Sequence, residues 1–288
     1  MPALRPLCLY HRNCLDGSAA AAVVQLFHPH AEFLPVQYGS PIPKVEGRLV
    51  YVVDFGFPLE QMRALRAQAS EVVWIDHHAS QVATHRALGW GILDTTECAA
   101  SLAWRTLFPG QPEPPVIAYV RDKDQWRWEL PDSRAIAAGL SKTFSESRFA
   151  GILTCDLDKM KRMGIPLLEK QAQRVTKAAA KGVAIADPFG LIGRRALAVP
   201  CHHDLNDLGD HVCTPIERGG LGYDLAILIY RKPDGAWVHS LRANGLVDCG
   251  QIADARGGGG HPNAACFIAR TPLLESFNIP AMTSDDVS

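Results

Sequence analysis

The sequence predicts an α/β protein of two domains, the first built on a parallel sheet and the second, smaller one on a mixed sheet. Three observations support this fold class. Short apolar runs alternate with helical patterns through the first half, as they do in parallel sheets. A second series of strand-like runs follows residue 187. One run, at residues 72–75, stops at the polar triplet Asp76-His77-His78, and ligands bind at such strand ends in open α/β sheets.

The first half contains five runs rich in branched and aromatic residues, which are typical of buried strands. We expect these strands at residues 6–10, 31–36, 47–53, 72–76 and 91–93. Helical patterns between them predict helices at residues 18–27, 59–69 and 98–108. Pro58 suits the start of the second helix, where a missing N–H costs nothing. A further apolar run at 116–120 leads to Asp122 and is expected to form one more strand.

A mainly helical segment at about 145–186 is expected to link the two domains, which we place at residues 1–186 and 187–288. The second domain is expected to hold strands at residues 196–200, 224–230 and 237–241, with a hairpin-type turn between the last two. A short helix at 248–255 then leads to four glycines at 257–260, which His261 follows. Phe267 and Ile268 are expected to belong to a last strand.

Composition limits the classes of function. The chain has 288 residues, of which 47% are hydrophobic, so it can bury a sizeable core. A formal charge of −1 argues against binding long duplex nucleic acid but leaves small anionic substrates open. The eight cysteines form no C-x-x-C pair, and no apolar run reaches the roughly 18 residues of a membrane span. With no signal-peptide pattern at the start, we expect a cytoplasmic protein with reduced thiols and no membrane partner.

Four polar residues share one placement along the chain, because each follows a strand-like run: His11, Asp54, Asp76 and Asp122. Parallel strands would bring them to one edge of the sheet. Carboxylates that lie this close repel one another, which raises their pKa values unless a cation neutralises them. Carboxylate and imidazole donors favour Mn²⁺, Mg²⁺, Fe²⁺ or Zn²⁺. Two such ions about 3.5–4 Å apart can activate water for phosphoryl transfer.

The order of these motifs resembles that of the DHH phosphoesterases, a family named for the triplet that stands here at residues 76–78. The chain resembles the oligoribonuclease-like and exopolyphosphatase-like members of this family. The family's other motifs are matched in order by His11 with Asp16, by Asp54 and by Asp122. The stretch at 257–265 resembles the Gly-Gly-Gly-His signature of the DHH-associated substrate-binding domain. The resemblance covers both halves and implies an active site in the cleft between the two domains.

The resemblance also implies a role for each matching residue. Five residues would hold the metal ions, with Asp54 bridging them: His11, Asp16, Asp54, His77 and Asp122. His78 would face the substrate phosphate, and Asp76 would orient a neighbouring group without touching the metal. Five residues of the second domain would bind the substrate phosphate: Arg242, Gly258, Gly259, Gly260 and His261.

Cys14 departs from the family pattern, because it stands where the family usually has the first acid of an Asp-x-Asp motif. A thiolate at this position would favour softer ions. A cysteine that merely fills buried space, which the sequence favours, would leave that metal weakly held. We therefore expect one or two divalent ions, Mn²⁺ before Mg²⁺ or another metal.

Together these patterns predict a metal-dependent phosphoesterase that hydrolyses phosphodiester or phosphomonoester bonds of short oligonucleotides or small nucleotides. Two alternatives stay open: a hydrolase of inorganic polyphosphate or pyrophosphate, and a non-catalytic sensor of a phosphate ligand. Trp126 and Trp128 suit either base stacking or core packing. The segment His202-His203-Asp204 is expected to be a solvated loop or a helix cap. Base preference, cleavage polarity and oligomeric state, a homodimer included, are left open.

Overall fold

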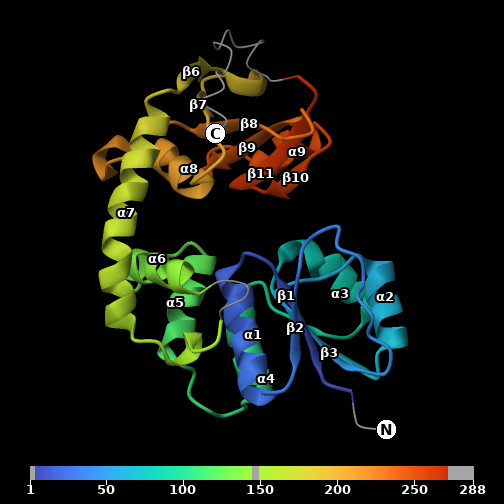
Figure 1. The fold of residues 1–288 in the computed structure, drawn as a ribbon. Coiled ribbons are helices and arrows are strands. Elements are labelled where there is room, and N and C mark those ends of the chain that lie inside the picture. The colour runs from blue at the N-terminus through green and yellow to red at the C-terminus, as the bar shows by residue number, and fades with distance from the viewer. Residues whose placement is uncertain (1–3, 145–148, 272–288) are drawn as a thin grey trace. The chain divides into compact units, whose positions relative to one another are not determined.

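The computed structural model describes residues 4–144 and 149–271, and the chain divides into two compact units, Met1–Leu168 and Glu169–Ser288. The division falls within the long helix α7 (Leu157–Ala179), which Figure 1 shows running through both units. This helix lies inside the segment that the sequence assigns to a linker. The domain boundary at residues 186 and 187 stays a prediction.

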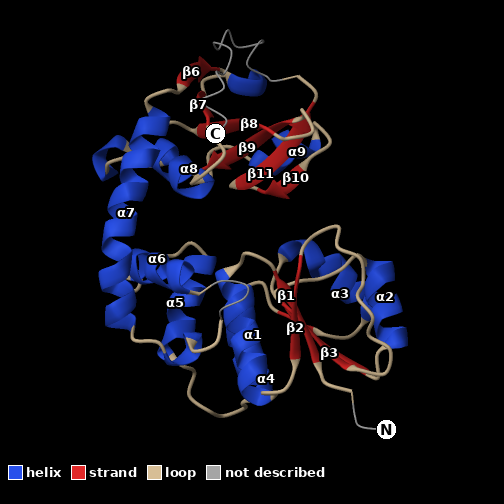
Figure 2. Cartoon of the chain, viewed as in Figure 1, coloured by secondary structure: helices blue, strands red, loops and turns tan. Residues whose placement is uncertain are grey.

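The first unit contains a five-stranded parallel sheet with the strand order β2-β1-β3-β4-β5. Its strands are β1 (Leu7–His11), β2 (Glu32–Val36), β3 (Leu49–Val53), β4 (Glu71–Asp76) and β5 (Ile92–Leu93). Its helices are α1 (Leu15–Phe27), α2 (Leu59–Gln68), α3 (Val82–Leu88), α4 (Ala99–Leu107), α5 (Pro115–Asp124) and α6 (Ser133–Thr143). All five predicted strands of the alternating pattern are confirmed, and Figure 2 shows β1, β2 and β3 in red among the blue helices.

The inner strands β1 and β3 are buried on both faces, which explains why they are apolar throughout, whereas the edge strand β2 is partly exposed. In β1, Cys8 and Tyr10 pack into a core shared with α1, α4 and α5, whereas Leu7 and Leu9 pack with α2 on the opposite face. The alanines and valines of α1 are buried, and this helix packs against α4. The small side chains allow this close packing beneath the end of β1.

The expected strand at 116–120 is wrong, because this run lies in helix α5. A five-residue apolar run does not distinguish a strand from a buried helix, and here Pro115 occupies the first helical turn, which it favours. Val116, Ile117 and Val120 form the buried side of the helix. Asp122 and Asp124 therefore lie in the last turn of a helix, where residues two apart point in different directions.

The second unit contains a six-stranded mixed sheet with the order β10-β11-β9-β8-β7-β6, in which β7 and β8 are parallel. The strands are β6 (Val183–Ala186), β7 (Arg195–Pro200), β8 (Leu225–Arg231), β9 (Trp237–Ala243), β10 (Gly259–His261) and β11 (Ala264–Ala269). Helix α8 (Leu205–Cys213) and the end of α7 cover one face, and α9 (Cys249–Asp254) covers the other. The predicted mixed sheet is confirmed.

Single-turn 3₁₀ helices complete the described chain at Ala79–Gln81, Ile152–Thr154, Pro188–Gly190 and Ile216–Arg218. Within residues 4–144 and 149–271, every helix is too short or too polar to cross a bilayer. All eight cysteines lie in these ranges and are free thiols. Asp204 stands at the N-terminal cap of α8, one of the two positions expected for the segment at 202–204.

Candidate metal centre

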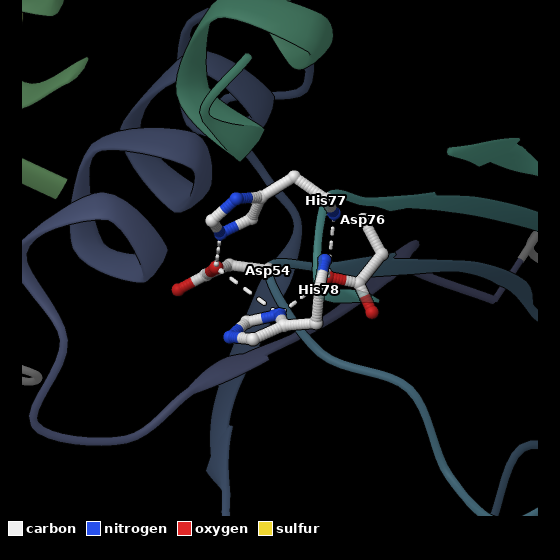
Figure 3. Close-up of side chains that lie close together, drawn as sticks. All are labelled: Asp54, Asp76, His77 and His78. Carbon is white, nitrogen blue, oxygen red and sulfur yellow. Dashed lines mark hydrogen bonds and ion pairs between the residues drawn. The ribbon is translucent and has the colours of Figure 1, made fainter. Parts of the chain in front are cut away.

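The candidate centre lies at the carboxyl ends of three adjacent strands of the parallel sheet. His11 ends β1, Asp76 ends β4, and Asp54 follows β3, which lies between these two strands. The three side chains therefore start from neighbouring strand ends, as the sequence predicts. His77 and His78 continue directly from β4, and Figure 3 shows their imidazoles on either side of the Asp54 carboxylate.

Asp54 is at the middle of the group, and it is completely buried. Its Oδ1 accepts a hydrogen bond from His77 Nε2 at 3.1 Å and lies 3.9 Å from His78 Nδ1. Its Oδ2 lies 3.6 Å from His11 Nδ1. The backbone of Asp54 has φ of 55°, in the left-handed region that few residues other than glycine adopt. This conformation is tolerated best by Asp and Asn among larger residues, and it aims the carboxylate at the histidines.

Gly17 lets helix α1 begin against this carboxylate. A Cβ atom at residue 17 would lie 2.7 Å from the backbone oxygen of His11 and 3.1 Å from Asp54 Oδ2. Any side chain would therefore push the first turn of α1 away from Asp54. The glycine that follows Asp16 is required by this close approach.

Asp76 holds His78 in one orientation. Its Oδ1 accepts hydrogen bonds from the backbone N–H groups of His77 and His78 at 2.7 and 3.3 Å, and from His78 Nδ1 at 2.7 Å. Since Nδ1 carries the proton in this bond, Nε2 of His78 is directed elsewhere. This arrangement is the one that an orienting role for Asp76 requires.

Two further acids lie near His77, whose Nε2 is 3.7 Å from Asp16 Oδ2 and 3.6 Å from Asp124 Oδ2. The Asp16 carboxylate also accepts hydrogen bonds from the N–H groups of Ala99 and Ala100, at 2.6 and 2.9 Å, at the start of α4. The N-terminus of a helix stabilises a negative charge, so α4 fixes Asp16 in place. Asp16 thus joins the first turns of two helices to the centre.

Asp122 does not lie with these residues, contrary to the placement that the sequence suggests. It is buried, and its carboxylate accepts hydrogen bonds from the N–H groups of Glu129 and Leu130 at 3.0 and 3.5 Å. Because α5 is a helix, Asp124 rather than Asp122 faces His77. The sequence does contain a signal for Asp124. It has acids at both 122 and 124, and if the run is a helix, only one of the two can point to the strand ends.

The charges in this cluster favour a bound cation. Burial raises the pKa of Asp16 well above its usual value, and the nearby Asp54 charge adds to the effect. Burial likewise raises the pKa of Asp124. Burial would lower the pKa of His77, but its hydrogen bond to Asp54 and the charges of Asp16 and Asp124 raise it to about 10. Without a metal, the site thus compensates its carboxylates by retaining protons, which divalent cations can replace.

The donor atoms present fit divalent metal ions. Three groups place their ligand atoms within 4.8 Å of one another: Asp54 with Asp76, His77 and His78; His11 with Cys14 and Asp54; Asp16 with His77 and Asp124. Four buried atoms of these groups have no hydrogen-bond partner among the described residues: His11 Nδ1, Asp54 Oδ2, Asp76 Oδ2 and Asp124 Oδ2. Burying such atoms without a partner is costly, and a cation would compensate them. The first group shares Asp54 with the second and His77 with the third, so the three groups are continuous and suit a pair of neighbouring ions.

In the second unit, strand register brings Arg242 and His261 into one row. Ala264 of β11 pairs with His261 of β10 on one side and with Arg242 of β9 on the other. Directly paired residues of antiparallel strands point to the same face, so the three side chains share one face, with a small alanine in the middle. Two strand spacings separate the outer residues by about 10 Å. The guanidinium of Arg242 donates to Asn206 Oδ1 at 2.8 and 2.9 Å and to Ser240 Oγ at 2.9 Å.

The glycine run has a structural cause of its own. A Cβ at Gly258 would lie 2.2 Å from the backbone oxygen of Cys266, and one at Gly260 would lie 2.4 Å from Ala265 Cα. Gly260 also has φ of 146°. These two glycines are thus needed for β10 to pair with β11, whereas a Cβ at Gly259 has only an ordinary contact at 3.5 Å. Gly258 and Gly260 are exposed and Gly259 is half-buried, which leaves the run accessible to a ligand.

Trp126 and Trp128 pack against each other, with ring centroids 5.0 Å apart. The guanidinium of Arg134 covers Trp128 at 4.5 Å from the ring. These contacts favour the packing interpretation of the two tryptophans over base stacking.

No family model matches the chain. One relative is found by sequence, protein R106 of Acanthamoeba polyphaga mimivirus, described as uncharacterized and 20% identical. The match covers 89% of this chain and 66% of the relative, so the chain spans just under two thirds of that protein's length.

Solved structures of DHH-domain proteins have the same fold. The DHH domain of a member of the s1p family of ribosomal proteins is 17% identical and superimposes with a TM-score of 0.63 over 95% of this chain and 86% of that one. PggH of Vibrio cholerae, a pGpG-specific phosphodiesterase, is 11% identical with a TM-score of 0.55 over 96% of both chains. Exonuclease RecJ bound to manganese is 16% identical with a TM-score of 0.54 over 95% and 88%. The chain therefore has the fold of the DHH-domain proteins, as the order of its motifs predicts.

Proposed function

We propose that the protein is a metal-dependent phosphohydrolase that cleaves phosphodiester or phosphomonoester bonds of short oligonucleotides or small nucleotides. One observation carries the proposal: Asp54, fully buried and in a left-handed conformation, directs its two oxygens toward different histidines, and one of those oxygens has no hydrogen-bond partner among the described residues. A cytoplasmic location is part of the same proposal, and a homodimer is compatible with it.

The residues that would hold the ions fall into two sets that share Asp54. One set is His11 with Asp54, and the other is Asp16, Asp54, His77 and Asp124. When bound, divalent ions would lower the pKa of water and neutralise the charge on the reacting phosphate. This assignment places Asp124 in the role that the sequence alone gives to Asp122. Manganese is our first choice of ion, as in the RecJ structure, with magnesium next.

His78 is suited to contact the phosphate. Burial would lower its pKa, but the hydrogen bond to Asp76 and the charge of Asp54 raise the pKa above the usual value. The imidazolium is therefore favoured, with Nδ1–H donating to Asp76 and Nε2–H left to donate to a phosphate oxygen. The side chain is 26% exposed, so a substrate can reach it.

A panel of substrates tests the proposal. With Mn²⁺, we expect hydrolysis of the dinucleotide pApA to exceed that of pyrophosphate and polyphosphate at least about 100-fold in kcat/KM. Products are measured by ion-exchange chromatography, and bis(4-nitrophenyl) phosphate gives a chromogenic check. Preferential release of phosphate from pyrophosphate or polyphosphate would instead establish the inorganic alternative. Nucleotide binding without turnover of any substrate would establish the sensor.

Arg242 provides a test of substrate binding. Arg242→Ala is expected to raise KM about 10- to 100-fold while lowering kcat much less, because a charge-assisted hydrogen bond contributes about 1.5–3 kcal/mol. Arg242→Lys keeps the charge but loses the forked geometry, so its KM should lie between those of the parent and the alanine variant. Steady-state kinetics with circular dichroism as a folding control make the measurement. An unchanged KM in Arg242→Ala contradicts the assignment.

A further inference from the structure

The cluster of His11, Cys14 and Asp54 has a donor set unlike the other groups of the centre. The sequence favours Cys14 as a residue that fills buried space, but its surroundings are not those of a filler. Cys8 and Cys98 are fully buried in the apolar core of the first unit. Cys14 instead lines a cavity of about 180 Å³ together with Asn13, Ser18, Lys123 and Ser141. Leu15 and Phe144 complete the lining, but most of the wall is polar, unlike the surroundings of Cys8 and Cys98.

The thiol has no local structural task. Cys14 occupies the N-terminal cap of α1, where its carbonyl oxygen accepts hydrogen bonds from the N–H and Oγ of Ser18, but its side chain makes no capping bond. Serine, threonine, aspartate and asparagine are the residues that cap well, and cysteine is not among them. Helix capping therefore does not explain a cysteine here.

His11 is arranged as a metal-binding histidine. Its Nε2 lies 3.0 Å from Gln37 Oε1, an oxygen that can only accept, so Nε2 carries the proton. The lone pair is then on Nδ1, which is buried and has no hydrogen-bond partner in the described chain. Metal-binding histidines commonly donate their other N–H to a carbonyl or carboxylate oxygen, which fixes the tautomer. Nδ1 faces Asp54 Oδ2 at 3.6 Å, and that oxygen is also buried without such a partner.

Cys14 Sγ completes this pair, because the ligand atoms of the three residues lie within 4.8 Å of one another. We propose that Cys14 Sγ is a metal ligand and that the His11–Cys14–Asp54 group binds a thiophilic divalent ion, such as Zn²⁺, Fe²⁺ or Co²⁺. The group of Asp16, His77 and Asp124 has no sulfur and takes an oxygen-preferring ion such as Mn²⁺ or Mg²⁺. The thiol proton is released to solvent as the S–metal bond forms.

The inference deepens the proposed function, on which it rests for the existence of a metal centre. It predicts a centre with two unlike ions. The His11–Cys14–Asp54 group would prefer metals that a group without sulfur binds less tightly.

Cobalt substitution tests the inference without turnover. Metal-free full-length protein titrated with Co²⁺ is expected to develop an intense near-ultraviolet band from thiolate-to-cobalt charge transfer. Cys14→Ser should lack this band and bind Zn²⁺ at least about tenfold more weakly in competition with a chelating dye. Cys155→Ser, which changes a half-buried thiol outside the cluster, should keep both properties. Asp124→Asn should keep the band, because it alters the other group.

Two results would overturn the inference: cobalt bound by the parent without the band, or a band that persists in Cys14→Ser. Cys14→Asp restores the acid of the family pattern. It should lose the band, and the number of Mn²⁺ ions that it binds per chain should equal the total number of ions that the parent binds. The two proposals fail separately. A parent with the band but no activity on any phosphate ester refutes the proposed function alone, and an active enzyme without the band refutes this inference alone.

Discussion

Asp54→Asn is expected to abolish hydrolysis, with kcat lower by at least about 10³-fold, a loss of about 4 kcal/mol of transition-state stabilisation. The carboxylate lies within 3.1 Å of His77 and 3.6 Å of His11, so both parts of the centre depend on its charge. Asparagine keeps the size of the side chain and tolerates the left-handed backbone at φ of 55°. The fold should therefore survive. Initial rates with pApA, the metal content and the thermal midpoint measure the three effects.

The matched control is Asp94→Asn. Asp94 follows β5 of the same sheet but accepts hydrogen bonds from Thr96 and lies outside the metal-type groups found in the described chain. Its variant should retain the parent's rate within about twofold, as surface substitutions usually have small effects. Parent-like hydrolysis by Asp54→Asn would remove the two-metal proposal, whatever its metal content.

The same variant has a second expected signature in the metal-free protein. The pKa of His77, raised to about 10 by Asp54, Asp16 and Asp124, should fall toward its usual value of about 6.5 when the Asp54 charge is lost. Because a raised histidine pKa stabilises the fold at low and neutral pH, this contribution in the parent is complete below pH of about 6.5 and disappears as the pH rises through 10. Asp54→Asn should weaken that pH dependence, because Asp16 and Asp124 still lie near His77, and titration of the imidazole by nuclear magnetic resonance measures the fall in its pKa.

The sequence predicts the centre best where residues follow strands. His11, Asp54 and Asp76 follow clear apolar runs, and parallel strands in one sheet end at the same edge. The helix at 115–124 could not be separated from a strand by its short apolar run, and on this helix Asp124 rather than Asp122 lies beside His77. A two-residue shift on a strand would keep the same face, whereas on a helix it does not.

Contacts between distant segments are the part that sequence patterns do not give. The row of Arg242 and His261 depends on the register of three strands, and register is set by packing and turn geometry. The support of Asp16 by the start of α4 joins residues more than eighty positions apart. The tautomer of His11, fixed by Gln37, likewise depends on where the end of β2 lies beside β1. Each of these features gives a predicted residue its precise environment.

Asp124→Asn and Asp122→Asn form a matched pair two positions apart on α5, and they are expected to fail in different ways. Asp124 Oδ2 lies 3.6 Å from His77 and has no hydrogen-bond partner in the described residues, so its loss should lower kcat about 100-fold or more and release one ion. Its effect on folding should be small, since removing a buried charge whose pKa is raised relieves repulsion. Metal analysis after gel filtration and initial rates measure both.

Asp122→Asn should instead lower stability and leave the ions in place. Its carboxylate accepts the N–H groups of Glu129 and Leu130 with different oxygens, and the amide nitrogen of asparagine cannot accept the second. Losing this half-buried hydrogen bond costs about 0.5–1.5 kcal/mol, which should appear as a lower midpoint of urea unfolding. The opposite result, in which Asp122→Asn loses an ion and Asp124→Asn keeps both, would make Asp122 the metal ligand. Helix α5 would then have to be rotated about its axis so that Asp122 faces His77.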